Sequence, residues 1–422
     1  MRCRPPVAEG KATRVTVGAS EIVVVGAGAI GTAVAYSLAK AGKTDVLVVE
    51  KGPAVATVTS AQAAGLVGQV RSSADRVRLA MWSVATFSEL ERNAAHKPSW
   101  RQVGSLRVAQ TAAREAEFHR LKAVCDEAGL AVELIDAKAA SRHWPDLRLE
   151  AARAILWCPT DGYLQPYDLA ASYLAEARTL GVIFAPNTTV TGIGLEAGRV
   201  SGVTTNHGFI RCETVINAAG QHAYHIARLV GLELPIVPVR HEYLVTVPLD
   251  GIRPNYPCYR VPDATLYGRP DVNSLLLGGW EADALSVDPR SYGLDGEAPP
   301  IVEDWPVLAG FVEQFQRLYA PVAGAGVRHV FSGWPTFTPD GRFIIGPSAR
   351  VPGFVMAGGC NAHGVSGSAG IGRHVVESLL DEKPSAYVRS LSPDRFTETS
   401  WDWDTARARA QAVYETYYHV GH

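Results

Sequence analysis

The chain of 422 residues lacks an excess of positive charge and long apolar runs, and each absence excludes a class of protein. Its net charge is −2, so nucleic acid and anionic membranes are not expected partners. Only eight of its 40 basic residues are lysine. No apolar run could cross a bilayer, and residues 1–20 lack the apolar segment of a signal peptide. We therefore expect a cytoplasmic protein without membrane insertion, preceded by a disordered extension over residues 1–20.

Paired cysteines are also missing. The six cysteines are scattered and form no C-x-x-C motif: Cys3, Cys125, Cys158, Cys212, Cys258 and Cys360. This spacing argues against a disulfide framework and a zinc site, and it fits a reducing compartment. We expect no bound metal.

The strongest pattern is a short apolar strand, Ile22 to Val25, that runs directly into a G-x-G-x-x-G motif. Gly26 permits a tight turn, Gly28 allows a pyrophosphate to approach the backbone, and Gly31 allows the next helix to pack closely. That helix, residues 32–41, would point its free N–H groups and positive dipole end at the phosphates. A structural turn is the alternative interpretation of the glycines alone.

A second strand, residues 45–49, ends at Glu50, which lies 24 residues after Gly26. An acid at this place accepts hydrogen bonds from ribose hydroxyls and repels a 2′-phosphate. The order of strand, glycines, helix, strand and acid predicts a dinucleotide site. Its expected contacts are Gly26, Ala27, Gly28, Ala29, Ile30, Gly31, Glu50 and Lys51.

The pattern of strands and helices predicts an α/β fold with two units. Buried apolar strands of the parallel type recur at 182–184, 214–216, 343–345 and 354–356. Between them, residues 239–279 contain strand-like runs with no helices, which predicts an antiparallel sheet. We therefore expect a discontinuous Rossmann-like domain with a parallel sheet and an inserted antiparallel-sheet domain. Residues 281–304, acidic and rich in proline and glycine, are expected to form a surface loop.

Several motifs in this order resemble FAD-dependent amino-acid oxidoreductases of the D-amino-acid-oxidase superfamily. The likeness is greatest to the flavin half of dimethylglycine and sarcosine dehydrogenases and dimethylglycine oxidase. The motifs are AQAAGL at 61–66, QVGSLRVA at 102–109, DGYLQPYDL at 161–169, INAAG at 216–220, PVRHEYLVT at 238–246, LYGR at 266–269, TPDGRFIIG at 338–346 and GGCNAHGVSG at 358–367.

The resemblance implies an FAD cofactor and a division of the chain. It assigns residues 21–95, 150–235 and 330–382 to the FAD-binding domain, and 96–149 and 236–329 to the substrate domain. The further flavin contacts that it implies are Gln62, Ala63, Ala64, Gly65, Leu66, Val190, Asn217, Ala218, Ala219, Gly220, Gly333, Asn361, His363, Gly364, Val365 and Ser366. His363 could equally be a helix-capping residue.

Three departures from the family pattern bear on the chemistry. Gln62 stands where members with covalent flavin have a histidine, and Gly333 stands where monomeric sarcosine oxidases have the linking cysteine. We therefore expect non-covalent FAD. Residues 139–382 contain no lysine, so the lysine that monomeric sarcosine oxidases place over the flavin to activate oxygen cannot come from them. This absence disfavours that oxidase type and leaves both oxygen and another electron acceptor open. Residues 383–422 resemble a connector to an absent folate-binding half, so trapping of a one-carbon product on tetrahydrofolate within this chain is not expected.

The resemblance also implies the catalytic candidates. His241 and Tyr267 align with a histidine and a tyrosine placed over the flavin, where they could accept the amine proton and bind the substrate. A substrate carboxylate would be held by a guanidinium group, with Arg269 and Arg71 favoured over the other candidates, Arg240 and Arg260. Structural or solvated roles are the alternatives for all of these residues. Asp161 and Asp340 are expected to form turns.

The function expected is oxidation of the C–N bond of a secondary or tertiary amine, an N-methyl or N-alkyl amino acid, by hydride transfer to flavin N5 followed by imine hydrolysis. A D-amino-acid, cyclic amino-acid or 2-hydroxy-acid dehydrogenase on the same fold is one alternative. A non-catalytic or electron-transfer flavoprotein subunit is another. Partners beyond the substrate and the acceptor would be a second copy of the chain or a partner subunit.

Overall fold

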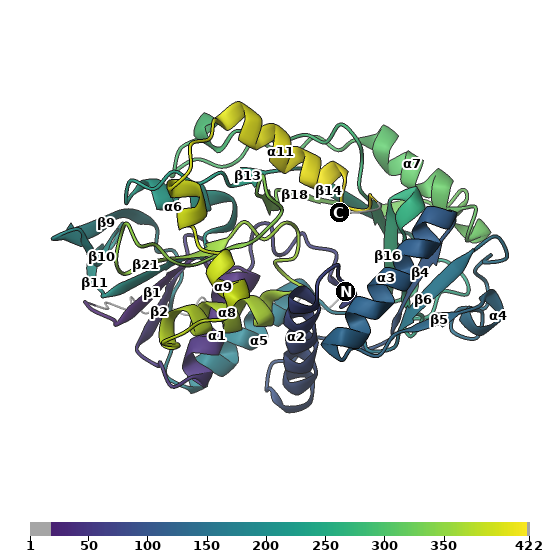
Figure 1. Ribbon diagram of the computed structural model, residues 1–422, viewed down its shortest axis with the longest axis horizontal. Coiled ribbons are helices and arrows are strands. Elements are labelled where there is room, and N and C mark those ends of the chain that lie inside the picture. Colours follow the sequence, from purple (N-terminus) through teal and green to yellow (C-terminus); the bar gives the residue numbers. More distant parts are fainter. Residues whose placement is uncertain (1–17, 420–422) are drawn as a thin grey trace, which may run out of the picture.

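The computed structural model describes residues 18–419, and two sheets dominate this part of the chain (Figure 1). The first is a six-stranded sheet in the order β20-β21-β12-β1-β2-β8, parallel except for β20. Its strands are β1 (Ile22–Val25), β2 (Val46–Val49), β8 (Ile183–Ala185), β12 (Thr214–Asn217), β20 (Ile344–Pro347) and β21 (Phe354–Gly358).

Both faces of this parallel sheet are covered, which explains why its strands are continuously apolar. Ile22 and Val24 pack toward the helices α1 (Ala29–Lys40), α5 (Pro166–Thr179) and α8 (Ser368–Leu380). Val23 and Val25 pack in the opposite direction, together with α6 (Ala223–Arg228) and a small antiparallel sheet. That sheet consists of β9 (Val190–Glu196), β10 (Arg199–Thr205) and β11 (Gly208–Arg211).

The second large sheet of the described chain has eight strands in the order β18-β14-β17-β16-β15-β4-β6-β5. All neighbouring pairs are antiparallel except β15 and β4. Its strands are β4 (Ser105–Ala109), β5 (Glu133–Ile135), β6 (Ala154–Cys158), β14 (His241–Thr246), β15 (Cys258–Val261), β16 (Leu266–Asp271), β17 (Ser274–Gly279) and β18 (Val327–Gly333). The helices α3 (Ala112–Ala128), α4 (Ala137–Ala140) and α7 (Trp305–Phe315) flank this sheet (Figure 1).

The expected fold class is confirmed, but two segments depart from the expected division of the chain. β6 pairs along five residues with β4, so residues 154–158 lie in the larger sheet and not in the nucleotide-binding unit. β18 crosses the expected boundary at residue 330, and all of it belongs to the same larger sheet, where it pairs with β14. The sequence of a short apolar strand does not indicate which strand it pairs with. Here β6 pairs with β4 and β18 pairs with β14, which places both in the larger sheet.

Two short ladders lie between the large sheets and bring their loops together. β3 (Leu66–Val67) pairs with β7 (Gly162–Tyr163), and β13 (Val237–Pro238) pairs with β19 (Thr336–Phe337). The long helix α2 (Ala74–Asn93) begins at Ser73, whose side chain caps it, and packs against α8 and α3. Loops that follow strands of both sheets therefore converge in the middle of the molecule.

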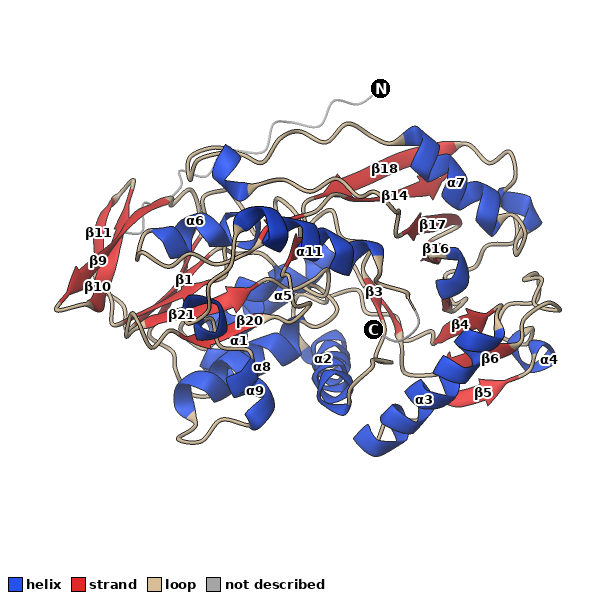
Figure 2. Cartoon of the chain, turned by 45° about the horizontal axis from the view of Figure 1, so that its top comes forward, coloured by secondary structure: helices blue, strands red, loops and turns tan. Residues whose placement is uncertain are grey.

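The C-terminal segment, expected to be a connector, folds onto the body of the protein. It contains α9 (Ala386–Ser390), α10 (Asp394–Thr397) and α11 (Trp403–Glu415). α11 runs across the molecule between the two large sheets (Figures 1 and 2). Ala410 and Tyr414 of this helix are fully buried against Phe337 and Tyr267. The segment is part of the core.

Most of the expected N-terminal extension, residues 1–17, lies outside the described residues. Within residues 18–20 Ala19 forms a parallel bridge with Arg211. No helix among the described residues is long and apolar enough to span a membrane.

Close helix packing at Gly372 provides a test of the fold. A Cβ atom at this α8 position would lie 2.7 Å from the Ala33 carbonyl oxygen of α1, which cannot move without shifting that helix. We expect Gly372→Ala to lower the free energy of unfolding by about 1–3 kcal/mol, measured by denaturant titration. The matched control is Gly310→Ala in α7, where a Cβ has no atom within 4 Å. It should stabilise the protein by up to about 1 kcal/mol, and equal losses in both variants would contradict the packing described.

Candidate cofactor and active site

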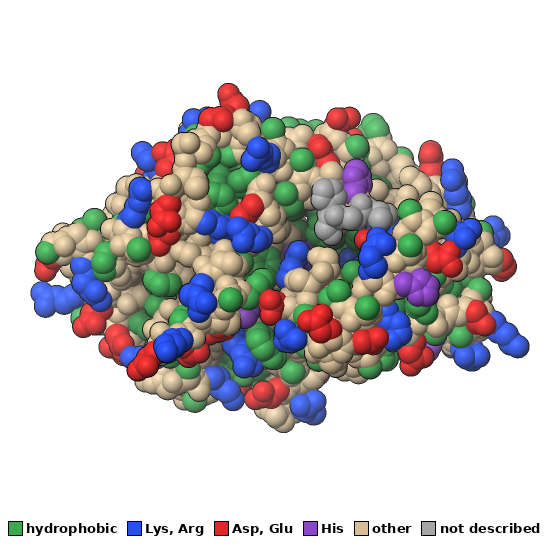
Figure 3. All heavy atoms as spheres, viewed as in Figure 1, with side chains coloured by type: hydrophobic (Ala, Val, Ile, Leu, Met, Phe, Trp, Pro, Cys, Tyr) green, Lys and Arg blue, Asp and Glu red, His purple; other side chains and the backbone are tan. Residues whose placement is uncertain are grey.

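Two connected hollows run from the parallel sheet to the larger sheet. The inner one spans about 1220 Å³ and the outer one about 890 Å³, the open space at their mouths included. They share the lining residues Ile30, Thr59, Ser60, Ala218, Gly220 and Gln221, so they form one continuous cavity. Figure 3 shows the surface hollowed near the centre of the molecule. A long ligand could therefore reach from the end of β1 to the face of the larger sheet.

The outer hollow lies at the turn between β1 and α1. Gly26 has a φ of +101°, and a Cβ there would lie 2.7 Å from the Ala218 carbonyl oxygen. Gly28, the N-cap residue of α1, has no side chain, and the Ser60 hydroxyl accepts from the Ala29 N–H at 3.0 Å. Gly28, Ala29 and Ser60 all line the hollow, so the positive end of the helix faces it. Glu50 also lines the hollow, and its carboxylate is held by the backbone N–H groups of Ala27 and Gly52, each at 2.8 Å. This is the arrangement expected for a pyrophosphate and a ribose.

Most of the expected cofactor residues line this cavity, but four lie behind its wall. The four are Ala27, Gly31, Asn217 and Asn361. Gly31 permits close packing, since a Cβ there would lie 1.8 Å from the Gly26 oxygen. Asn217 donates to the Ala223 carbonyl, and Asn361 donates to Gly359 while accepting from the Thr338 N–H. These residues shape the loops around the cavity.

Residues 281–304, expected to form a surface loop, partly cover the outer hollow. Leu294 lines it, and Glu297 contacts both Lys51 and Gln221. Tyr292 donates a hydrogen bond to the Gln221 carbonyl at 3.0 Å. Lys51 therefore lines the hollow but is also paired with an acid of the insertion. Composition alone did not reveal this contact between distant segments.

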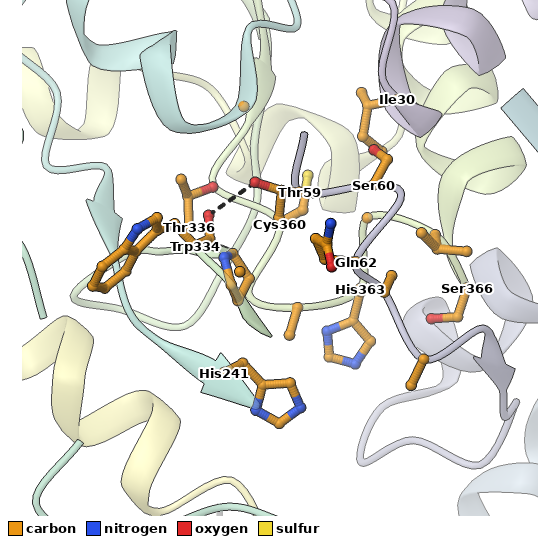
Figure 4. A pocket seen from close by; sticks show the side chains of 18 of the residues that line it. Ile30, Thr59, Ser60, Gln62, His241, Trp334, Thr336, Cys360, His363 and Ser366 are labelled. Carbon is orange, nitrogen blue, oxygen red and sulfur yellow. Dashed lines mark hydrogen bonds between the residues drawn. The ribbon is translucent and has the colours of Figure 1, made fainter. Parts of the chain in front are cut away.

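The inner hollow brings together the two positions at which a covalent flavin link was considered. A Cβ at Gly333 would lie 3.3 Å from Gln62 Cβ, and both residues line the hollow. The rest of the segment from Ala63 to Leu66 lines it as well. Figure 4 shows Gln62, His363 and His241 projecting into the same cavity from three separate segments.

The loop before α8 forms another wall of the inner hollow. Asn361 and Ala362 have φ values of +46° and +59°, which turn the chain so that His363 to Ser366 line the cavity. His363 Nδ1 donates to the Asn361 carbonyl, and Nε2 accepts from the Tyr417 hydroxyl at 3.0 Å. Burial, with smaller effects of nearby arginines, holds the pKa of His363 well below its usual value. His363 is therefore neutral, and the N-terminus of α8 follows directly.

His241 and Tyr267 meet at the cavity, as the resemblance implied. His241 Nε2 lies 2.7 Å from the Tyr267 hydroxyl, and His241 Nδ1 lies 2.9 Å from the Tyr414 hydroxyl. Burial lowers the pKa of His241 to about 4, so the ring is neutral near neutral pH. Register explains the proximity, because β14 and β16 both pair with β17, where Gly278 lies opposite both Tyr243 and Tyr267.

Two residues of this arrangement were missed in the sequence. The Tyr414 hydroxyl donates to Glu281, which is buried at 8% exposure, and Tyr414 itself is fully buried. Tyr417, three residues later, lines the inner hollow. The signal in the sequence was the aromatic run YETYY at 414–418, but nothing local indicates that it folds back over the cavity.

The arginine predictions divide into two pairs. Arg71 and Arg260 line the inner hollow, and Arg260 donates to the Tyr418 hydroxyl at 2.9 Å. Arg269, a favoured candidate, does not line it, because its guanidinium donates to the carbonyls of Ala64 and Pro270 and to Asp271. The prediction that Arg269 holds substrate is therefore wrong, and the residue instead anchors the flavin loop.

Arg240 does not reach the hollow either. It lies 2.7 Å from Asp304, 3.6 Å from Glu281 and 3.7 Å from Glu242. Asp161 is more than a turn residue, since its carboxylate accepts from Ser105 and from the Gln69 backbone and side chain. Asp340 does form the expected turn, bonding the Arg342 N–H and the Arg395 guanidinium.

Residues 21–378 match the family described as FAD dependent oxidoreductase. The chain belongs to this family. The resemblance drawn from the motifs is thereby confirmed, and FAD is the cofactor of the family.

Curated relatives include enzymes that act on methylated amines. 4-Methylaminobutanoate oxidase (formaldehyde-forming) of Paenarthrobacter nicotinovorans is 29% identical over 89% of this chain and 45% of its own length. Human mitochondrial sarcosine dehydrogenase is 27% identical over 95% of this chain and 44% of its own length. The mouse mitochondrial pyruvate dehydrogenase phosphatase regulatory subunit is 28% identical over 89% of this chain and 43% of its length. The chain thus spans less than half the length of each of these relatives.

Among solved structures, L-proline dehydrogenase from P. horikoshii has the same fold. The TM-score is 0.82 at 23% identity, and the match covers 91% of this chain and 99% of that one. Identity at this level supports the shared architecture alone.

The cavity fits FAD on its own evidence. The N-terminus of α1 with Gly28 and the Ser60 hydroxyl would hold the pyrophosphate, and Glu50 the ribose. The residues around Gln62 and the loop from His363 to Ser366 would hold the isoalloxazine ring in the inner hollow. The positive end of α8 would then stabilise negative charge on the ring.

The lining residues predict that FAD is not covalently attached. Gln62 and Gly333 occupy the two positions considered for a link, and neither side chain is a nucleophile. Acid precipitation of the purified protein should therefore leave all yellow colour in the supernatant, measured by absorbance. Colour remaining in the washed pellet would show that another residue makes the link.

Proposed function

We propose that this protein oxidises the C–N bond of a secondary or tertiary amine that carries a carboxylate, such as an N-methyl or N-alkyl amino acid. The observation that carries the proposal is the pairing of His241 with Tyr267 in a hollow that Arg71 and Arg260 also line. The relatives named for methylated amines support the choice of substrate class. Bound FAD would accept a hydride from the carbon next to nitrogen.

The protein's own groups prepare the substrate. The Tyr267 hydroxyl, which is held by neutral His241, provides a hydrogen-bond acceptor for the amine, which must lose its ammonium proton before a hydride can leave. Trp280, Trp334 and Tyr417 provide apolar walls that keep water away from the reacting carbon. Released imine then hydrolyses in water to an aldehyde and a shortened amine.

Arg71 and Arg260 support the choice of a substrate that carries a carboxylate. Burial, followed by the charges of Arg107 and Arg260, lowers the pKa of Arg71 to about 10, so the group still carries its charge at neutral pH. Arg71 donates to the Val70 carbonyl and Arg260 to Tyr418, both of which are neutral acceptors. Two such cations at one cavity favour an anionic ligand.

A second candidate is a flavoprotein subunit without its own turnover. The likeness to a subunit named as regulatory favours it. Three observations would distinguish such a subunit from an enzyme: it would bind FAD, no amine would reduce its flavin, and it would co-purify with another chain.

Anaerobic bleaching of the bound flavin is the test of the proposed function. N-methyl amino acids should bleach the visible absorbance of the oxidised flavin faster than D-amino acids, proline or 2-hydroxy acids. Admission of air afterwards reports whether oxygen re-oxidises the flavin. Preferential bleaching by a D-amino acid or a 2-hydroxy acid would contradict the proposal, and bleaching by no compound would favour the subunit.

Carboxylate recognition by Arg71 has a separate test. Arg71→Gln should raise the substrate concentration that gives half-maximal bleaching by about 10–100-fold, since a charge-assisted hydrogen bond contributes ~1.5–3 kcal/mol. It should have little effect with the methyl ester of the same substrate. The matched control is Arg78→Gln on the outer face of α2, which removes the same charge from a side chain that is 42% exposed. Equal behaviour of the two variants would remove Arg71 from the binding site.

A further inference from the structure

Three hydrogen bonds behind the cavity form a chain with a fixed direction. It runs from Tyr267 through His241 and Tyr414 to Glu281. An ionised carboxylate can only accept, so Tyr414 must donate to Glu281. The Tyr414 oxygen then accepts from His241 Nδ1–H, which leaves Nε2 as the lone-pair atom that accepts from Tyr267. Every donor therefore points away from the cavity, and the Tyr267 oxygen presents a free lone pair to it.

The end of this chain is equipped to hold a proton. Glu281 is buried, and its Oε1 has no hydrogen-bond partner among the described residues. Burial, partly offset by the Tyr414 hydrogen bond and by Arg240, raises the pKa of this carboxyl group. Arg240 lies at 3.6 Å and is itself shared with Glu242 and Asp304, the latter partly exposed. These are the charged groups that face Glu281, so its charge is only partly compensated.

We propose that Glu281 is the terminal proton acceptor for the substrate ammonium group, reached through Tyr267, His241 and Tyr414. The inference rests on the proposed amine oxidation and adds two residues to it. Tyr267, His241 and Tyr414 relay the proton, and Glu281 stores it away from the flavin.

The transfer balances at each atom. The ammonium N–H bond breaks and its proton joins the Tyr267 oxygen, while the Tyr267 hydroxyl proton moves to His241 Nε2. The Nδ1 proton of His241 moves to Tyr414, whose own proton forms an O–H bond on Glu281. Each relay residue ends with the number of protons with which it began. No electrons move in this step, and the neutral amine is ready to lose its hydride.

The chain also explains why α11 closes over the cavity. Tyr414 is the residue of this helix that contacts both His241 and Glu281, and Tyr417, just beyond the helix, contacts His363. The ring of Trp280 stacks on Tyr417 with centroids 3.8 Å apart and lies 4.8 Å from the His241 ring. This aromatic packing keeps bulk water from entering the relay and short-circuiting its direction.

The test uses the FAD-bound enzyme and the rate of anaerobic flavin reduction between pH 6 and pH 10. Glu281→Gln keeps the side-chain size and can still accept from Tyr414, but it cannot take a proton. Tyr414→Phe interrupts the chain one step earlier. Both variants should reduce the flavin about 100-fold more slowly than wild type at pH 7, which is within the range of general base catalysis. Their rates should approach that of wild type at high pH, where the free amine exists in solution.

The matched control is Glu242→Gln, which removes a buried carboxylate beside Arg240 without touching Tyr414. Its pH profile should match that of wild type. A second readout is the infrared difference spectrum on reduction by substrate, which should contain a protonated-carboxyl band that Glu281→Gln lacks. FAD content and the unfolding temperature confirm that each variant is folded.

The outcomes separate this proposal from the proposed function. If amines bleach wild type and the pH profiles of Glu281→Gln and Tyr414→Phe match it, the proton chain is overturned while the function stands. A shift of equal size in Glu242→Gln would assign the effect to charge near Arg240 and also overturn the chain. If no amine bleaches wild type at any pH, the function itself fails and the chain loses its substrate.

Discussion

Loss of water from polar groups is the constraint on which this structure depends. His241, His363 and Glu281 are buried away from bulk solvent. Burial lowers the pKa of the two histidines and raises that of Glu281, and both changes favour the neutral form of the group. A buried polar group without a partner costs about 1–3 kcal/mol, so each of these side chains must be hydrogen-bonded. The partners are Tyr414 and Tyr417, which come from the far end of the chain. The packing of the C-terminal segment therefore provides hydrogen-bond partners for the buried groups of the cavity.

The architecture brings these groups together through backbone geometry. β14 and β16 are held side by side with β17, which presents His241 and Tyr267 at the same end of the larger sheet. Arg269 lies two residues after Tyr267 on β16. Its guanidinium donates to the Ala64 carbonyl and so fixes the loop from Gln62 to Leu66. Thus the sheet that carries the reacting groups also positions the loop that would lie against the flavin.

The sequence predicted what depends on local pattern. The glycine spacing, the continuous apolar strands and the run GGCNAHGVSG were sufficient to place the cofactor cavity and the helices around it. The arginines were predicted from residue type alone, and type does not determine direction. Arg240 lies beside the buried carboxylates of Glu242 and Glu281, and Arg269 donates to the Ala64 carbonyl. Glu281 and Tyr414 were missed because they are 133 residues apart and meet only through tertiary packing. The assignment of β6 failed for the same reason, since strand partners are chosen at long range.

The distribution of charge around the cavity suits the separation of a hydride from a proton. Arg71 and the N-terminus of α8 place positive potential at the walls of the inner hollow, where negative charge on a reduced flavin would need it. Glu281 lies behind His241, at the end of a relay whose donors all point away from that hollow. No lysine is among the described lining residues of the inner hollow, so its fixed positive charge comes from Arg71, Arg260 and the helix dipole. In the proposed reaction the hydride and the proton would therefore leave the substrate in different directions, which would oppose their recombination.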